Sequence, residues 1–236
     1  NKLYKYSLHK NIYEFYYKIF KIYKIFKLNI FLYYKNINSM NPNLVFLNSF
    51  LDVSKETFSK LKRISVPKKL EEGDQIAKPG EVPNKIYMLV SGMMRVYLSS
   101  ENGKEFNKNF FLPFSFVGAL TALIQNQPSR LTYEALTECQ VYEINFSKIT
   151  ELCKSDINIS NLYSRILEHV FIRYEERQLE LISMDAKAQY LALLKKMPNI
   201  EELIPQYQIA SYLSITPVQL SRIRRKIKKE EVKENN

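Results

Sequence analysis

The clearest indication of function is a cluster of six cationic residues within eight positions near the end of the chain. They are Arg222, Arg224, Arg225, Lys226, Lys228 and Lys229, and no acidic residue occurs between Glu202 and Glu230. Such side chains neutralise phosphates, and arginine also pairs with the edge of a guanine base. The cluster therefore predicts nucleic-acid binding, although a solvated basic helix is the purely structural alternative.

Two helices joined by a tight turn are expected to position these cations. Residues 206–213 predict the first helix, in which Ala210 is the small residue that lets the two helices cross closely. Residues 214–215 form the turn, with an apolar isoleucine facing the core. Thr216 is a good N-cap, and Pro217 suits the first helical position because its missing N–H costs little there.

The second helix separates an apolar face from a polar one. Leu220, Ile223 and Ile227 recur at helical spacing and are expected to be buried. Residues on the other face are predicted to contact DNA, with Arg222 on guanine and Gln219 on adenine. The candidate DNA-binding residues are Thr216, Val218, Gln219, Ser221, Arg222, Arg225 and Lys226.

A long helix is predicted over residues 156–183, which contain neither glycine nor proline. Its apolar residues recur at helical spacing, which favours packing against a second copy of the chain; packing on its own domain is the alternative. The stripe contains Ile159, Leu162, Tyr163, Ile166, Val170, Phe171 and Tyr174, continued by Leu181 and Ile182. A further helix is expected over 186–196, with Asp185 as its cap.

Short strands separated by turns are expected over residues 64–147. Residues 85–90 and 94–98 are typical strands, and a hairpin turn follows with Asn102-Gly103 at its centre. All five glycines of the chain fall in this region, which fits a compact β-structure with tight corners. Residues 52–63 precede it as a short amphipathic helix capped by Asp52 or Ser54.

The first 39 residues differ in composition from the rest of the chain. They hold eight lysines and one glutamate, and the first methionine is Met40. We expect residues 1–39 to be a non-native or disordered extension, with native translation starting at Met40. A membrane-surface helix and an extra folded element are the rival interpretations, and the first is weakened because lysines at every third position wind around a helix. No secretory signal is recognised, so a cytoplasmic protein is expected.

Metal and redox chemistry have few residues to draw on. The chain has two cysteines, Cys139 and Cys153, and two histidines, His9 and His169. This is too few for a disulfide framework, a four-thiolate cluster or a histidine-rich metal centre. We therefore expect no metal, no cofactor and no catalytic residues, so the protein is not expected to be an enzyme.

From about residue 50 to residue 229 the sequence resembles the Crp/Fnr family of transcription regulators. The resemblance lies in the residues that run from Glu72-Gly73-Asp74 through Gly80, in 86–92, in 95–97, and in 103–105. It implies an α+β fold with an N-terminal double-stranded β-helix (a β-roll), a long dimerisation helix and a C-terminal winged helix-turn-helix. It also implies a homodimer on palindromic double-stranded DNA and contact with RNA polymerase.

A phosphate-binding cassette of this family is recognised from residue 116 to residue 135, with departures at its polar anchors. The candidate effector-pocket residues are Gly118, Ala119, Leu120, Ser129 and Arg130. Ala119 stands where cyclic-nucleotide-binding members have a ribose-binding glutamate, and Ser129 stands where they have the phosphate-binding arginine, with Arg130 displaced by one. The departures imply that cyclic AMP is not an effector.

The predicted organisation is thus a sensor roll over 40–155, a dimerisation helix over 156–184 and a DNA-binding domain over 185–236. The predicted function is sequence-specific transcription regulation with a degenerate nucleotide pocket and an unknown effector. The alternative is a ligand-gated interaction or membrane-surface protein whose basic tail binds other anionic partners. The dependence of binding on salt and on base sequence distinguishes the two.

Overall fold

The computed structural model describes residues 41–234, and the chain divides into two compact units, 1–45 and 46–236. In the first unit only residues 41–45 are described, and they include the start of helix α2 (Pro42–Asn48). The expectations for residues 1–39 lie outside the described residues. The second unit contains all the strands and the remaining helices of the described residues.

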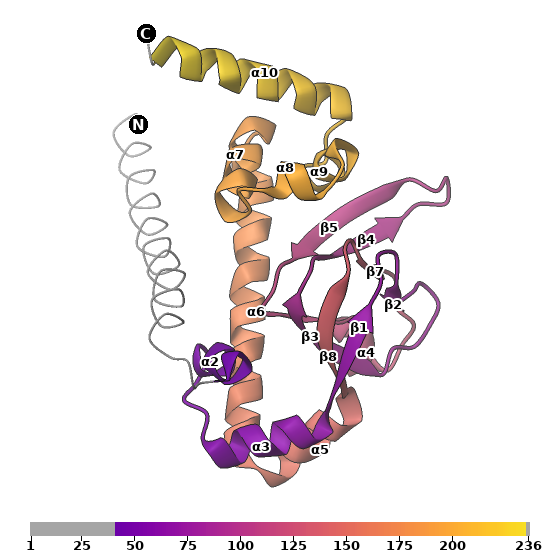
Figure 1. Cartoon of the computed structure of the whole chain (residues 1–236). Helices are drawn as coiled ribbons and strands as arrows, with labels where there is room; N and C mark the ends of the chain where they lie inside the picture. Colours follow the sequence, from indigo (N-terminus) through magenta and orange to yellow (C-terminus); the bar gives the residue numbers. More distant parts are fainter. Residues whose placement is uncertain (1–40, 235–236) are drawn as a thin grey trace, which may run out of the picture. The chain divides into compact units, whose positions relative to one another are not determined.

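Two four-stranded antiparallel sheets form the roll (Figure 1). The first has the order β1-β8-β3-β6 and the second the order β2-β7-β4-β5. The strands are β1 (Ser65–Leu70), β2 (Gln75–Ala77), β3 (Lys85–Ser91), β4 (Met94–Ser99), β5 (Glu105–Phe111), β6 (Ser115–Val117), β7 (Thr132–Ala135) and β8 (Cys139–Asn145). Apart from the β4–β5 hairpin, neighbours in each sheet are not consecutive in the sequence, as expected of a double-stranded β-helix.

Alternating side chains build the core between the two sheets. In β8, Cys139 and Val141 are buried while Gln140 is exposed, which is the period-two pattern of a strand with one buried face. Leu89 of β3 and Met94 of β4 are fully buried in the same core cluster. The predicted strands 85–90 and 94–98 and the hairpin turn at 101–104 are confirmed.

Gly92 connects the two sheets where no side chain fits. Its φ is +89°, and a Cβ at this position would lie 2.3 Å from the carbonyl oxygen of Glu138 and 2.6 Å from the sulfur of Cys139. Gly80 has a similar φ of +85°, but nothing lies within 4 Å of its hypothetical Cβ. Both glycines provide a left-handed turn, and only Gly92 also allows close backbone approach.

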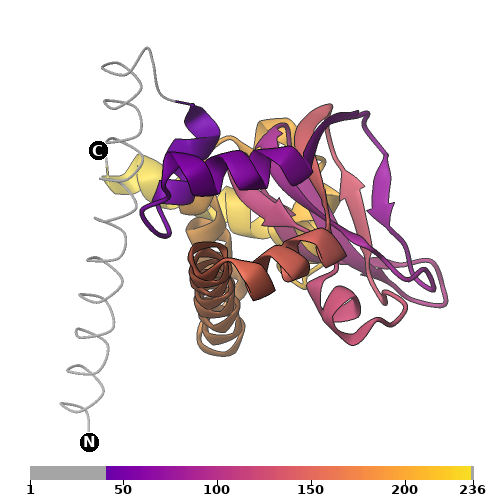
Figure 2. The same cartoon turned by 90° about the horizontal axis from the view of Figure 1, so that it is seen from below.

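Helices flank the roll (Figure 2). Helix α3 (Lys55–Ile64) begins at Ser54, whose side chain accepts a hydrogen bond from the backbone N–H of Thr57, so Ser54 is the cap and not Asp52. Helices α4 (Leu120–Gln125) and α5 (Phe146–Ser155) lie further along, and α6 (Ile157–Ser183) confirms the predicted long helix.

The apolar stripe of α6 divides into two halves with different surroundings. Ile159 and Leu162 near its start are 1% and 3% exposed, so this half packs on its own domain. Further along, Phe171 is 65% exposed and Ile182 is 81% exposed. Packing on the same domain therefore accounts for the first half only, and the second half keeps its apolar residues exposed.

Four helices follow α6 in the described part of the chain. They are α7 (Ala186–Lys196), α8 (Ile200–Leu203), α9 (Gln206–Tyr212) and α10 (Pro217–Glu234). Asp185 caps α7 as predicted, since it accepts from the N–H of Ala188. The α+β fold with a β-roll is confirmed, but no strand lies between residues 184 and 234, so these residues form a helix-turn-helix without the strands of a wing.

We expect Gly92→Ala to lower the free energy of unfolding by about 3 kcal/mol, because a left-handed alanine costs roughly 1–2 kcal/mol and overpacking typically adds 1–3. Gly80→Ala is the matched control and should cost only about 1 kcal/mol, since it has the strained φ but open space. Urea unfolding followed by circular dichroism measures both. Equal losses would contradict the close approach at Gly92.

Candidate nucleic-acid interface

Helix α10 begins at a capping box. Thr216 Oγ1 accepts from the N–H of Gln219 at 3.2 Å, and Gln219 Oε1 accepts from the N–H of Thr216 at 2.8 Å. Pro217 between them has no N–H to satisfy. These reciprocal bonds occupy backbone donors that the first turn of a helix otherwise leaves unpaired, so the start of α10 is well defined.

The turn before α10 has the left-handed geometry that many tight turns give to glycine. Ser214 takes φ +57°, and the N–H of Ile215 donates to the carbonyl of Ala210 at 3.0 Å. Serine in this conformation costs free energy that glycine would not. Serine in place of glycine is tolerated here, because the turn still closes and directs α10 away from α9.

One face of α10 is buried as predicted. Leu220 is fully buried, and Ile223 and Ile227 pack partly buried against the same core cluster. That cluster also contains Ile209 and Ala210 of α9, both fully buried. The small side chain of Ala210 lies in the close packing between the two helices.

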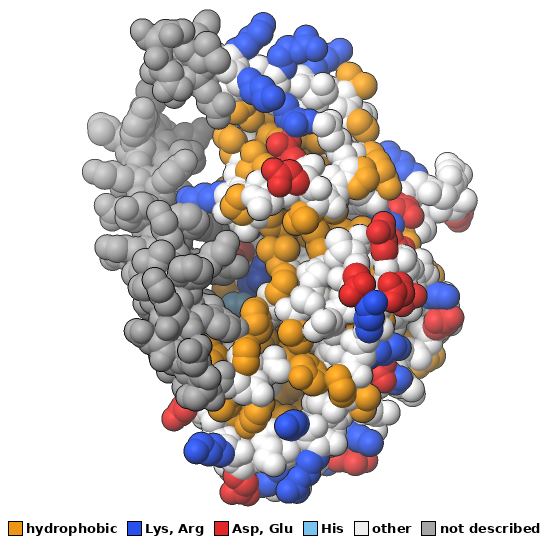
Figure 3. Space-filling model, viewed as in Figure 1, with side chains coloured by type: hydrophobic (Ala, Val, Ile, Leu, Met, Phe, Trp, Pro, Cys, Tyr) orange, Lys and Arg blue, Asp and Glu red, His pale blue; other side chains and the backbone are white. Residues whose placement is uncertain are grey.

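All seven candidate DNA-binding residues lie on the exposed side. Thr216, Val218, Gln219, Ser221, Arg222, Arg225 and Lys226 are each solvent-exposed. Blue Lys and Arg side chains gather over α10 in the upper part of Figure 3. An exposed, cationic helix face directly after a tight turn has the form that enters the major groove in helix-turn-helix proteins.

Two polar residues of α10 bond to groups within the protein. Gln219 Oε1 is held in the capping box, so a bidentate pair with adenine, which needs both the oxygen and the amide nitrogen, would have to open that box. Arg224 is turned toward α8, where its Nε lies 2.7 Å from Glu201 Oε1. Tyr190 of α7 donates to the same carboxylate oxygen. Arg224 therefore anchors α10, whereas Arg222 and Arg225 stay exposed.

The candidate effector residues are spread between buried and exposed positions. Ala119 and Ser129 are 4% exposed, while Arg130 is exposed. Ser129 Oγ donates to the carbonyl of Leu131 at 2.8 Å and accepts from its N–H at 3.1 Å. Gly118 and Leu120 flank Ala119 at the start of α4. The buried position of the cassette is thus occupied by Ser129, whose short side chain bonds to the backbone of Leu131 within the same turn.

Apolar groups fill the roll next to the cassette. Ala119, Ala122, Tyr133 and Ala135 belong to one buried cluster, with Phe111 packed against it. The rings of Tyr133 and Phe111 are stacked with centroids 6.4 Å apart. Burial raises the pKa of Tyr133 to about 12, so its phenol stays neutral at physiological pH.

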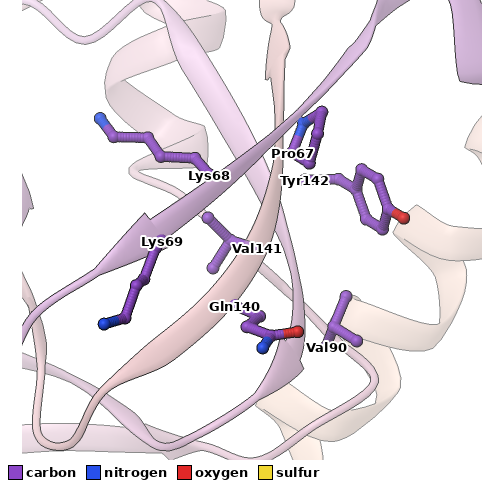
Figure 4. A pocket seen from close by; sticks show the side chains of 7 residues that line it. All are labelled: Pro67, Lys68, Lys69, Val90, Gln140, Val141 and Tyr142. Atoms are coloured by element: carbon purple, nitrogen blue, oxygen red, sulfur yellow. The ribbon is translucent and has the colours of Figure 1, made fainter.

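A hollow of about 290 Å³ lies away from the cassette, beside strands β1, β3 and β8 (Figure 4). Its lining includes Lys68 and Lys69, which both form ion pairs: Lys68 Nζ lies 3.5 Å from Glu143, and Lys69 Nζ lies within 3.0 Å of both Glu71 and Glu138. Each of these lysines thus already has an acidic partner. The hollow contains none of the predicted effector residues.

Sequence reasoning missed Arg95, which lies where the roll contacts α9. Its side chain is 6% exposed, and it bonds to residues of β5, β7 and α9. An arginine between apolar residues of a strand gave no indication of its partners, because its partner on α9 is 113 positions away. In the described residues no group of three or more His, Cys, Asp or Glu side chains could hold a metal ion.

Comparison with known proteins identifies the class of the roll. Residues 67–156 match the family described as "Cyclic nucleotide-binding domain", which covers most of β1 and continues to the end of α5. This part of the chain is therefore similar to cyclic nucleotide-binding domains.

Curated and solved relatives are regulators of the Crp/Fnr type. CRP-like protein Clp of Xanthomonas campestris is 19% identical over 148 residues, which is 62% of this chain. The chain thus spans 64% of the length of that relative, less than two thirds. FixK2 of Bradyrhizobium japonicum has a TM-score of 0.60 at 18% identity, covering 71% of this chain and 86% of its own.

A third likeness agrees with these two. The solved CLP regulator of Xanthomonas campestris has a TM-score of 0.56 at 16% identity, covering 75% of this chain and 93% of its own. At these identities the likeness defines the fold, and the resemblance to the Crp/Fnr regulators is confirmed at that level. Among the described residues, no helix is long and apolar enough to cross a membrane.

Proposed function

We propose that the chain is a sequence-specific, DNA-binding transcription regulator of the Crp/Fnr type that acts as a homodimer in the bacterial cytoplasm. The observation that carries the proposal is the exposed cationic face of α10, capped at Thr216 and buried on its other side. A helix exposed in this way and attached to a regulator-type roll supports DNA recognition. It supports less well the alternative, an interaction or membrane-surface protein whose basic tail binds another anionic partner. Contact with RNA polymerase is part of the same proposal.

The two ends of α10 have different tasks in this proposal. Residues near its start reach base edges, and Arg222 is the exposed residue suited to bidentate pairing with guanine. Lys228 and Lys229 lie further along and are exposed, so they neutralise phosphates. The first contacts select a sequence, and the second supply salt-dependent affinity.

Selection of binding sites from random duplex DNA by the purified chain tests this function. An enriched palindrome is expected, with half-sites separated by about 34 Å, one helical turn. Arg222→Ala should then lose preference at one position of each half-site, about 1–3 kcal/mol of discrimination. Lys229→Ala should weaken binding to all sequences equally, and it should reduce the slope of log affinity against log salt concentration by about 1. Binding without any base preference would contradict the proposal.

The second half of α6 supports association of two copies. Its exposed apolar side chains include Val170, Phe171, Ile172, Tyr174, Leu179, Leu181 and Ile182. A row of this kind along a helix is unfavourable in water and is buried when two such helices pair. Pairing of the two helices brings together two helix-turn-helix units, one from each copy, as a palindrome requires.

We expect Phe171→Glu to raise the dimer dissociation constant at least tenfold, because pairing would bury an unpaired carboxylate. Sedimentation velocity over a concentration series measures the change. Asn161→Glu is the matched control, since it puts the same charge on an exposed position of the first half of α6. A dimer equally stable in both variants would place the interface elsewhere.

The cassette supports a degenerate nucleotide pocket. A buried Ser129, whose hydroxyl is bonded to Leu131, replaces the arginine that the family resemblance leads one to expect, and Arg130 is exposed. Ala119 offers no carboxylate to a ribose. Loss of two charged hydrogen bonds, each worth roughly 1.5–3 kcal/mol, weakens binding about a thousandfold or more.

Calorimetric titration should therefore show no binding of cyclic AMP at low micromolar concentration. The Xanthomonas CLP structure is described as c-di-GMP responsive, so the same titration should include c-di-GMP as the alternative cyclic nucleotide. A low micromolar dissociation constant for cyclic AMP would show that the pocket has other polar anchors.

A further inference from the structure

Polar groups join helix α9 to the roll over a small surface, the roll contact, made by Arg95, Asn107, Gln208 and Ser211. Arg95 Nη1 donates to Gln208 Oε1 at 2.8 Å, and Asn107 Nδ2 donates both to the same side-chain oxygen and to the backbone carbonyl of Gln208, the latter at 3.0 Å. Arg95, Asn107 and Gln208 are 5%, 6% and 3% exposed. The amide of Gln208 is therefore the centre of a buried polar contact between two parts of the chain.

The charge of Arg95 is balanced within the roll. Its Nη2 lies 2.9 Å from Glu134 Oε1 and its Nη1 lies 2.6 Å from Glu105 Oε2. The guanidinium also stacks on the ring of Tyr97, 3.9 Å from the centroid. Its direction is thus fixed by strands β4, β5 and β7 before Gln208 of α9 accepts from it.

Backbone groups of β5, an edge strand, complete the roll contact. Ser211 Oγ accepts from the N–H of Asn107 at 2.9 Å and donates to the carbonyl of Glu105 at 2.8 Å. The register between β4 and β5 shifts here: Val96 pairs with Asn109 and Tyr97 with Asn107, so Lys108 is a bulge. Bulges change the direction of neighbouring groups, and this one accompanies the turn of β5 toward α9.

Helix α6 supplies a separate attachment to the same region. Arg177 Nη2 donates to the carbonyl of Tyr212 at 2.8 Å, and the guanidinium lies 4.0 Å from the centroid of that ring. Phe110 of β5 also packs on Tyr212, with ring centroids 5.2 Å apart. The helix-turn-helix is therefore held by the roll and by the long helix together.

We propose that the roll contact sets the spacing between the two DNA half-sites that the protein accepts, with Gln208 as the central positioning residue. The inference rests on the proposed function. Helix α9 and the turn at Ser214 carry α10, so fixing α9 against the roll fixes the direction of α10 relative to α6. In a two-fold dimer built on α6, a fixed direction gives one separation of the recognition helices. Without the roll contact, that separation varies.

The positioning role is separable from DNA contact itself. Gln208 and Asn107 are buried, whereas the candidate DNA-binding residues of α10 are exposed. Loss of the roll contact should therefore leave the affinity for a single half-site unchanged. The effect should be confined to DNA on which both half-sites must be reached at once.

The test uses the palindrome selected by the wild-type chain and versions with the central spacer changed by about one or two base pairs. Wild type is expected to prefer one spacing at least tenfold. Gln208→Ala should reduce this preference to within about threefold, with half-site affinity unchanged within about twofold. Gln206→Ala, the same change at an exposed position of the same helix, should behave as wild type.

Asn107→Ala provides a second measurement from the roll side, because it leaves the helix-turn-helix sequence intact. It should relax the spacing preference as Gln208→Ala does. The double variant should lose less than the sum of the two single losses, since both changes remove the bond between Asn107 and the side-chain oxygen of Gln208. A spacing preference that stays sharp in either variant overturns the inference while leaving the proposed function intact. If wild type selects no palindrome at all, the proposed function fails, and the inference fails with it.

Discussion

A guanidinium that is enclosed by protein needs partners for its charge and for its N–H donors. Arg95 finds these partners on four elements. Strands β5 and β7 supply the carboxylates of Glu105 and Glu134, β4 supplies the ring of Tyr97, and α9 supplies the amide of Gln208. Removing one partner of such a buried group leaves a costly unsatisfied charge. The relative positions of these elements, and of everything they carry, therefore depend on one another.

This arrangement also connects the cassette with helix α9. Strand β7 begins at Thr132, three residues after Ser129, and Glu134 on that strand bonds to Arg95. Energetic coupling in proteins requires a physical element that both sites can bias, and a strand shared by the two is such an element. A ligand that moved β7 would act on the guanidinium first and on α9 through it.

Local signals were sufficient for most of the fold. Asp185 before α7, the Asn102-Gly103 hairpin and the Thr216-Pro217 helix start each depend on interactions within a few residues, so they could be predicted from the sequence. The capping role of Gln219 had a local signal too, since threonine three residues before glutamine forms a capping box, and the contact of Gln219 with adenine stays a prediction. The partners of Arg95 and Arg224 could not be predicted, because they come from distant elements that only the folded chain brings together.

The helix-turn-helix shares its hydrophobic core with the roll. Met93 and Phe110 of the roll lie in the same buried cluster as Ile209 and Leu220. A segment of this size buries too little surface to be very stable alone, and here part of its apolar surface is covered by the roll. Heating should consequently melt roll and helix-turn-helix in a single cooperative transition, with one calorimetric peak whose enthalpy belongs to both.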